Sequence, residues 1–384
     1  MNLRRHVLNM ASASMDSTSS CDRYAMNGNN IVVGLNGALQ KRFILPNNQG
    51  LVPGNVHRAT HVDFGVGGKG QDVAISLHCL LEPGRSSNDH KPNDCDTDAA
   101  ATTASTSSNN IRLLQFIGTG SAGDVVHNLL NDRLGKNTMD FTVRSSSKMR
   151  TCTSIVSADE TTELVEPSGS ITSDELEKLF SVVSSNRNDR TEFGTNESTT
   201  RSLCIMGSMP PGCPEDTYAR IYAQTASPNT VCVVDSLAGT GPLLQTVSEM
   251  GQGNEKNNAA GPLLFKINAS ELCKMAGTSK SNSETGGITV SELTNAIEGF
   301  LAKYSTGSNN NDSSTGMIGL AITDGKHDAY FVSIKNATTS QEEQASSSPS
   351  FSVFKLPVPN LDHGSSRTLY PIGAGGKYTS RPYY

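Results

Sequence analysis

The chain of 384 residues has no long apolar run and no concentrated run of Lys or Arg. A membrane-spanning helix needs about 20 predominantly apolar residues, so we expect none. Proteins that bind nucleic acids carry basic patches or stripes, whereas this chain has a formal net charge of −6. We therefore expect neither a membrane nor a nucleic acid as a partner.

The eight cysteines show no CxxC spacing, and several lie in apolar runs such as LCIM and VCVV. This pattern favours buried thiols in a reducing compartment. Residues 1–28 are too polar to contain a signal-peptide core. We interpret them as a disordered tail on a cytoplasmic protein. Their arginines and serines also permit a transit peptide, so an organelle is the alternative location.

A dinucleotide-binding fingerprint is also missing. No GxGxxG motif follows the first predicted strand with an acidic residue at the expected distance, which argues against a dinucleotide-dependent oxidoreductase. The nearest match, GTGSAG at Gly118 to Gly123, comes after the second main strand, and we interpret it as a turn.

Short apolar runs alternate with helical periodicity along the chain, as in a mostly parallel sheet covered by helices on both faces. The sequence thus predicts an α/β fold, a three-layer αβα sandwich in one domain over residues 29–376. The predicted helices include Val73, Val125 and Val290. The predicted strands are Ile31 to Val33, Leu113 to Ile117, Leu203 to Met206, Val231 to Val234, Leu263 to Ile267 and Met317 to Ile322.

Two further stretches, Arg42 to Phe64 and Arg150 to Val165, are strand-prone with polar alternation. They suit a small β-sheet lid beside the main sheet. Polar tracts rich in Ser, Thr, Asn and Asp interrupt the pattern, and we expect them to be surface loops because they bury little apolar area. These tracts are 86–110, 184–200, 251–260, 278–287, 305–316 and 337–350.

Two glycine-rich segments are candidate ligand-binding loops. In GVGGKGQDVA, from Gly65 to Ala74, paired glycines precede a predicted helix, whose exposed N–H groups favour anionic or hydroxyl-rich ligands. Lys69 adds a point charge suited to phosphate. Near the C-terminus, YPIGAGGK from Tyr370 to Lys377 could form an anion-binding nest of backbone amides.

The order of three motifs resembles the PfkB branch of the ribokinase-like carbohydrate kinases. These motifs are GGKG, GSMPPG at Gly207 to Gly212, and PIGAG near the end. The segments GNVHRA, FIGTGSAGD and TELVEP extend the resemblance toward the hexose-phosphate kinases, such as the 1-phosphofructokinase and tagatose-6-phosphate kinase branch. The resemblance implies a ribokinase-like fold with a β lid, and it permits a homodimer through that lid.

On the substrate side, the resemblance implies that a sugar or sugar phosphate binds at residues from the first strand, the GGKG motif and the lid. Gln40 and Asp72 depart from the family pattern, since an aspartate and an asparagine are usual there. Arg150 corresponds to an arginine near a substrate phosphate, a role that its planar fork suits; a surface arginine at a strand edge is the alternative. The implied set is Asn36, Gln40, Gly67, Gly68, Lys69, Asp72 and Arg150.

On the nucleotide side, the resemblance implies ATP and Mg²⁺ as cofactors. The run from Lys266 to Glu271 resembles a KxNxxE segment, in which Asn268 and Glu271 organise the water shell of magnesium. Without the resemblance, Glu271 would be a first-turn glutamate that complements the helix dipole. Thr323 and Gly325 flank Asp324 in a loop that resembles a phosphate-contacting turn, and an ordinary hairpin is the alternative.

The family places a catalytic aspartate directly after GAG, which is here Gly373, Ala374 and Gly375. The base position is Gly376, and glycine cannot accept a proton. Residues 377–384 form an atypical tail. The alternatives are a pseudokinase that still binds ligands and a C-terminus altered by truncation, splicing or a misread gene. The sequence thus predicts an ATP-dependent kinase of a sugar or sugar phosphate, with a hexose phosphate favoured by the resemblance, whose base is missing as written. The alternative is a non-catalytic sugar- or nucleotide-binding protein on the same scaffold.

Overall fold

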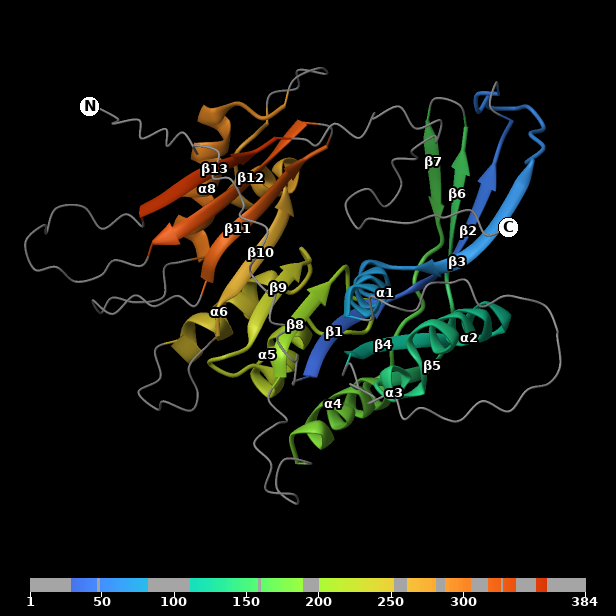
Figure 1. The fold of residues 1–384 in the computed structure, drawn as a ribbon, viewed down its shortest axis with the longest axis horizontal. Coiled ribbons are helices and arrows are strands. Elements are labelled where there is room, and N and C mark those ends of the chain that lie inside the picture. The colour runs from blue at the N-terminus through green and yellow to red at the C-terminus, as the bar shows by residue number, and fades with distance from the viewer. Residues whose placement is uncertain are drawn as a thin grey trace, which may run out of the picture.

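A computed structural model describes residues 29–46, 49–81, 111–157, 160–188, 200–251, 261–280, 287–304, 317–325, 327–335 and 350–357. Among these residues, no helix is long and apolar enough to cross a membrane. Two sheets organise the chain, and helices cover the larger sheet on both faces (Figure 1). The α/β class and the mostly parallel main sheet are therefore confirmed.

The large sheet has nine strands in the order β13-β12-β11-β10-β9-β8-β1-β4-β5. All neighbours from β5 to β11 are parallel, and β12 and β13 are added antiparallel. The strands are β1 (Asn29–Asn36), β4 (Ile111–Thr119), β5 (Thr142–Lys148), β8 (Thr200–Met206), β9 (Val231–Asp235), β10 (Leu263–Asn268), β11 (Met317–Asp324), β12 (His327–Lys335) and β13 (Ser350–Leu356).

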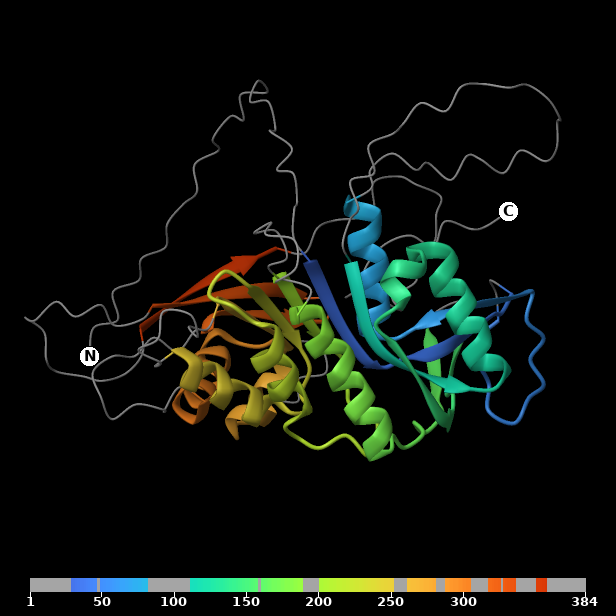
Figure 2. The ribbon, with the colours of Figure 1, turned by 90° about the horizontal axis from the view of Figure 1, so that it is seen from below.

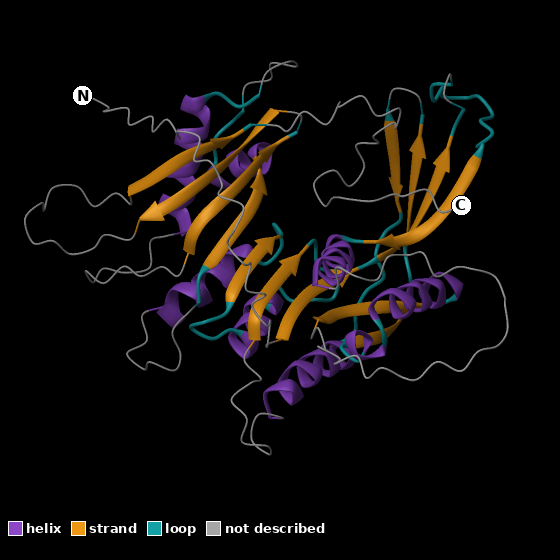
Figure 3. Ribbon diagram, in the orientation of Figure 1, coloured by secondary structure: helices purple, strands orange, loops and turns teal. Residues whose placement is uncertain are grey.

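The lid is a separate four-stranded sheet with the order β3-β2-β6-β7. It stands beside the main sheet at the end of β1 and contains both segments that the sequence assigned to a lid (Figure 3). Its strands are β2 (Ala38–Ile44), β3 (His61–Gly67), β6 (Thr151–Val156) and β7 (Thr161–Val165).

One face of the main sheet carries most of the helices. The apolar sides of the helices from α4 onward pack there against alternate strand residues such as Ile205, Val234 and Phe265 in one continuous core. These helices are α4 (Ser173–Asn188), α5 (Thr217–Thr225), α6 (Thr240–Gly251), α7 (Ala269–Ala276) and α8 (Val290–Tyr304).

The opposite face is covered by α1 (Lys69–Leu81) and α2 (Ser121–Leu134), with the short α3 (Lys136–Met139) at its edge. Their core includes Val32, Leu113 and Val126, and Val233 of β9 packs against its margin. In Figure 2, α6 and α8 lie below the far strands, whereas α1 and α2 lie above only the β1 and β4 side. Coverage of the second face therefore ends near β9 in the part of the chain that the structure describes.

Strand burial reflects this difference. β1 is buried at every position except Asn36, as a strand covered on both faces must be, whereas β10 alternates buried and half-buried residues. The apolar sequence of β10 alone did not distinguish these two situations. Its half-buried positions include Lys266 and Asn268, which therefore lie on the face of β10 opposite the main core.

Several expected loop boundaries shift in the structure. The tract expected from residue 184 begins inside α4, because the helical period of Leu176, Leu179 and Val183 carries the helix on to Asn188. Ser350, expected to close the last polar tract, already pairs with Lys335 in the sheet. The tracts 86–110 and 305–316, the N-terminal residues 1–28 and the motif YPIGAGGK lie outside the described residues.

Candidate active site

Polar and charged side chains gather where the parallel strands of the main sheet end. Asn36 ends β1, Asp235 ends β9, Asn268 ends β10 and Asp324 ends β11. Because these strands are parallel, their carboxyl ends lie along one edge, which is where ligands bind in open α/β sheets. The first strand and the KxNxxE segment, far apart in sequence, thus contribute to the same edge.

Asn36 is fixed by hydrogen bonds from both sides. Its Oδ1 accepts from the Ser168 hydroxyl at 2.8 Å, and its Nδ2 donates to Ser208 Oγ at 2.9 Å. Ser208 belongs to the GSMPPG motif, so the structure brings this motif to the end of β1. The Asn36 side chain is therefore positioned before any ligand arrives.

Arg150 connects the base of the lid to the end of β1. Its Nη2 donates to the carbonyl oxygen of Asn36 at 2.7 Å, and its Nε donates to that of Gly37 at 3.2 Å. A guanidinium has five N–H donors, so these two bonds leave others for a ligand. Arg150 is half-buried and is not the free surface arginine of the alternative interpretation.

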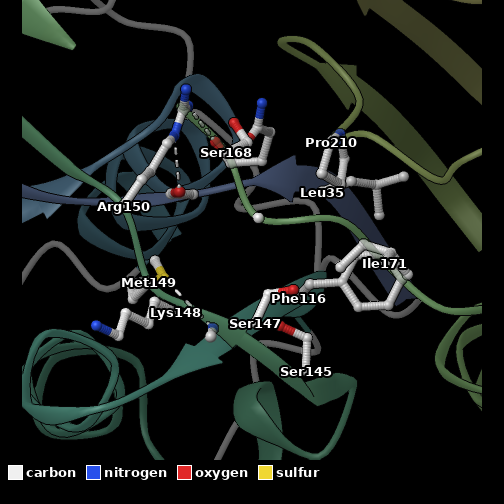
Figure 4. Close-up of a pocket in the computed structure, with 14 residues that line it drawn as sticks. Leu35, Phe116, Ser145, Ser147, Lys148, Met149, Arg150, Ser168, Ile171 and Pro210 are labelled. Carbon is white, nitrogen blue, oxygen red and sulfur yellow. Dashed lines mark hydrogen bonds between the residues drawn. The ribbon is translucent and has the colours of Figure 1, made fainter. Parts of the chain in front are cut away.

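A small pocket opens beside Arg150 between the ends of β1, β4 and β5 (Figure 4). Arg150 and Ser168 stand on one side of it, and Ser145 and Ser147 stand on the other. Leu35, Phe116 and Ile171 supply an apolar wall. The polar side chains that line it are Asn36, Ser145, Ser147, Lys148, Arg150 and Ser168. Hydroxyls and cations around one pocket suit an anionic, hydroxyl-bearing ligand.

Gln40 lies on the lid and not beside Asn36. Its Nε2 donates to Ser154 Oγ at 2.6 Å, and that hydroxyl donates to Glu163 Oε1 at 3.3 Å. The strand register places Arg42 directly across from Ser154, on the same face of the lid. One lid face therefore carries a polar chain, which the sequence had not predicted beyond Gln40.

The GGKG glycines let α1 approach β1 closely. A Cβ on Gly70 would collide with the backbone of Gly34, and Gly68 has a φ of +124° that only glycine adopts readily. Gly67, the last residue of β3, pairs with Ala38 of β2. The start of α1 is thereby pressed against the end of β1, and Lys69 is carried to the strand edge.

Gln71, and not Asp72, is the inward-facing residue after this motif. Gln71 is buried and donates to the carbonyl of Gly34 at 2.9 Å and to Gln115 Oε1 at 2.8 Å. Asp72 keeps an exposed side, although partial burial raises the pKa of its carboxyl to about 6 against the opposing charge of Arg133. The helical period could have identified Gln71, since it lies three residues before the buried Ala74.

Asp235 joins the two halves of the site. Its Oδ1 accepts from Lys69 Nζ at 2.7 Å, and its Oδ2 accepts from Lys266 Nζ at 2.8 Å. Lys69 was assigned to the substrate side and Lys266 to the nucleotide side, so the structure brings these residues together around one carboxylate. The sequence motifs assign no role to Asp235. Its place at the end of the run VCVVD was the available signal.

Asn268 and Glu271 form a capping box at the start of α7. Asn268 Oδ1 accepts from the Glu271 amide at 2.8 Å, and Glu271 Oε2 accepts from the Asn268 amide at 3.0 Å. The helix-cap interpretation of Glu271 is therefore correct as local structure. The capping bond uses only Oε2 of Glu271, so the cap leaves Oε1 for a hydrated cation.

The turn after β11 is both a hairpin and a binding-loop candidate. β11 pairs antiparallel with β12, and Gly325 has a φ of +60° in the turn. Asp324 points inward, where it accepts from Lys280 Nζ at 2.6 Å and from the Ile288 amide at 2.5 Å. Thr323 lies across from Asn268 in the sheet. Asp324 therefore holds this turn against the segments that flank α7 and α8.

The predicted anion hole, Gly373, Ala374 and Gly375, and the base position Gly376 lie outside the described residues. In the part of the chain that the structure describes, no group of three or more His, Cys, Asp or Glu residues could hold a metal ion directly. Magnesium needs oxygen ligands and usually keeps several waters. The amide of Asn268 and the remaining oxygen of Glu271 fit a hydrated ion of this kind.

The arrangement of sheet, lid and strand-edge site defines the ribokinase-like fold. The chain is similar to phosphofructokinase-2 from Escherichia coli in complex with fructose-6-phosphate, with a TM-score of 0.54 and 17% identity over 91% of this chain and 83% of that one. It is also similar to ribokinase from Giardia lamblia, with a TM-score of 0.52 and 12% identity over 91% and 79% of the two chains. No family model and no curated protein matches the sequence. The ribokinase-like fold that the motif resemblance implies is thus confirmed.

Proposed function

We propose that this protein is an ATP-dependent carbohydrate kinase that phosphorylates a hydroxyl of a sugar phosphate. The observation that carries the proposal is the convergence of Lys69 and Lys266 on Asp235. This convergence joins the GGKG motif to the KxNxxE segment at one strand edge. A kinase must bring its acceptor and its nucleotide phosphates together at such a point.

The acceptor would bind between Asn36, the pocket beside Arg150 and the polar face of the lid. Arg150 and Lys148 line that pocket together with three serines, which supports a phosphorylated sugar over a neutral one. Phosphofructokinase-2, a structural neighbour, was observed with fructose-6-phosphate. That ligand is therefore the first acceptor to test.

The nucleotide would lie along the ends of β10 and β11. Lys266 supplies a cation for its phosphates, Thr323 and Gly325 border the turn, and Asn268 and Glu271 would hold the waters of Mg²⁺. Magnesium would neutralise charge on the transferred group. The acceptor oxygen forms a bond to the γ-phosphorus as the bond to ADP breaks, and the hydroxyl proton leaves to a base or to water.

Gly376 favours a second candidate function, a binding protein that retains the ligand sites without turnover. A general base contributes about 10²- to 10⁴-fold to rate, and glycine at that position offers none. Asp235 does not replace it, since both of its oxygens are paired with lysines. The two functions differ in turnover and not in binding.

We also propose that the lid forms a homodimer. On its second face Val62 pairs with Phe43, Phe64 with Lys41 and Leu164 with Thr153, and the apolar Val62, Phe64 and Leu164 are exposed there. Apolar residues gathered on one sheet face favour association. Light scattering would show a dimer that Phe64→Lys dissociates; a monomer at all concentrations would contradict this.

The test of function is phosphotransfer from ATP-Mg to fructose 6-phosphate, other hexose phosphates, free hexoses and nucleosides. Thermal shifts with each ligand are recorded on the same protein. Turnover with a sugar phosphate supports the kinase, and stabilisation without turnover supports the binding protein. If no sugar and no ATP gives either turnover or thermal stabilisation, both the kinase and the binding protein are contradicted.

A further inference from the structure

Asp235 occupies an unusual place for a carboxylate in a site meant for phosphates. Its side chain is 16% exposed and each oxygen holds one lysine, Lys69 at 2.7 Å and Lys266 at 2.8 Å. Its backbone is fixed as well, because its carbonyl accepts from the Gly207 amide at 2.8 Å. The carboxylate is therefore held between the two cations that incoming phosphates would approach.

The net charge of Lys69, Lys266 and Asp235 determines how this group acts on an incoming anion. The two ammonium groups carry +2 and Asp235 carries −1, which leaves one uncompensated positive charge. A phosphate ligand must draw a lysine away from Asp235 and then lie close to a like charge. A ligand that brings its own cation does not meet this repulsion, since the cation compensates the carboxylate.

We propose that Asp235 is an internal counter-ion that weakens the binding of metal-free anions and thereby selects for ATP that carries its metal. The inference rests on the proposed function only in assigning Lys266 to the nucleotide. Lys69 and Lys266 share Asp235, so the same carboxylate also opposes sugar phosphate and nucleotide binding together when no metal is present. Nothing in this role requires Asp235 to accept a proton or to contact the reacting atoms.

The test compares wild type with Asp235→Asn, which keeps the shape and removes the charge. Isothermal titration with ATP in a chelator should show binding at least tenfold tighter in the variant, equivalent to about 1.4 kcal/mol. In wild type, ATP-Mg should bind at least tenfold tighter than chelated ATP, and Asp235→Asn should reduce that ratio. Added salt should narrow the difference between the proteins, because screening weakens the repulsion.

Asp328→Asn is the matched control, since Asp328 also pairs with a lysine, Lys355 at 2.6 Å, but on the outer strands. It should leave the affinity for chelated ATP unchanged. Asp235→Ser provides a second neutral variant if the amide misfolds, and circular dichroism checks both. Chelated ATP that binds a neutral variant no tighter than wild type would overturn the proposal. If neither variant folds, equal wild-type affinities for ATP with and without magnesium would overturn it.

The outcome also separates this inference from the proposed function. If chelated ATP binds the neutral variants more tightly but no sugar phosphate is phosphorylated by wild type, the counter-ion role stands and the kinase proposal fails. If wild type phosphorylates fructose 6-phosphate but Asp235→Asn loses affinity for chelated ATP, the kinase stands and the counter-ion role fails.

Discussion

The two halves of the main sheet are built differently. Around β1 and β4, helices cover both faces, and Asn36, Gln71 and Arg150 are locked by hydrogen bonds to neighbouring elements. From β10 to β13, the described helices cover one face only, and the half-buried residues of the strands line the other. The first half would offer the proposed acceptor a preformed site, whereas the described helices leave one face of the second half uncovered next to Lys266 and Asn268.

The two halves also differ in how firmly their polar side chains are held. Asn36, Gln71 and Arg150 are each held by hydrogen bonds to neighbouring elements. On the other side, Glu271 keeps one carboxylate oxygen outside its capping box. The residues that would complete the second half, including Gly373 to Gly376, lie outside the described part of the chain. The predictions below test each half against the other.

The largest expected effect comes from restoring a base to the otherwise complete site. If only the base is missing, Gly376→Asp should raise kcat for phosphotransfer to fructose 6-phosphate by about 10²- to 10⁴-fold. Coupled detection of ADP measures the rate. Tyr378→Asp, which adds the same charge two residues later, is the control and should give no gain. An unchanged kcat in Gly376→Asp would mean that the nucleotide half lacks more than a base.

The next effect concerns stability and tests whether the second face of β10 to β13 is open. Phe300 of α8 is fully buried against Phe265, so Phe300→Ala should lower the free energy of unfolding by about 3–5 kcal/mol. Phe354 of β13 is 45% exposed, and Phe354→Ala should cost only about 1–2 kcal/mol. Urea unfolding measures both. Equal costs would show that Phe354 is covered as deeply as Phe300.

A smaller effect tests the rigidity of the acceptor half. Arg150→Lys loses the planar fork that holds the carbonyls of Asn36 and Gly37. We expect KM for the sugar phosphate to rise about tenfold, or about 1.4 kcal/mol, with KM for ATP unchanged. Arg144→Lys is the control, because Arg144 pairs with exposed Asp124 on the outer surface. A parallel rise in both KM values would contradict the division between the two halves.

The smallest expected effect is the pH dependence of stability that Asp72 of α1 causes in the half around β1 and β4. Its pKa is raised from 3.8 to about 6 by burial, so the folded state binds its proton more tightly than the unfolded state. Stability should therefore fall as pH rises through this window. Asp72→Asn should gain at most about 1 kcal/mol at pH 7, because the group is partly exposed and screened.

That gain should disappear below about pH 4, where Asp72 is protonated in both states. Thermal unfolding from pH 4 to pH 8 measures it. Asp132→Asn, which removes an exposed carboxylate from α2, is the control and should show no such trend. A gain that grows as pH falls would contradict the assignment.

The strands were predictable because each is an apolar run, and all six predicted strands lie in the main sheet. The lid was predictable from its polar alternation. Strand β5 was not predicted, because its sequence TVRSSSK is mostly polar. Helix α5 was not predicted either, although Tyr218, Ile221 and Tyr222 recur at helical spacing in TYARIYAQT and are buried. Tertiary packing against Ile205 and its neighbours decides their structure.

The site was predictable as a set of motifs but not as a geometry. GGKG, KxNxxE and GSMPPG carry recognisable residues, yet the meeting of Lys69 and Lys266 at Asp235 depends on the pairing of β8, β9 and β10. Strand order is a long-range property that no local pattern encodes. The same holds for Gln71, which the motifs did not single out and which the packing of α1 turns inward.

The central claim is that an acceptor half and a nucleotide half meet at Asp235. Binding of fructose 6-phosphate and of ATP-Mg to Lys69→Gln and Lys266→Gln, measured by isothermal titration, tests it most directly. Lys69→Gln should weaken the sugar phosphate about tenfold or more and leave ATP-Mg nearly unchanged, while Lys266→Gln should do the reverse. Unchanged affinity for both ligands in both variants would contradict the claim that these lysines mark the two sides of one kinase site.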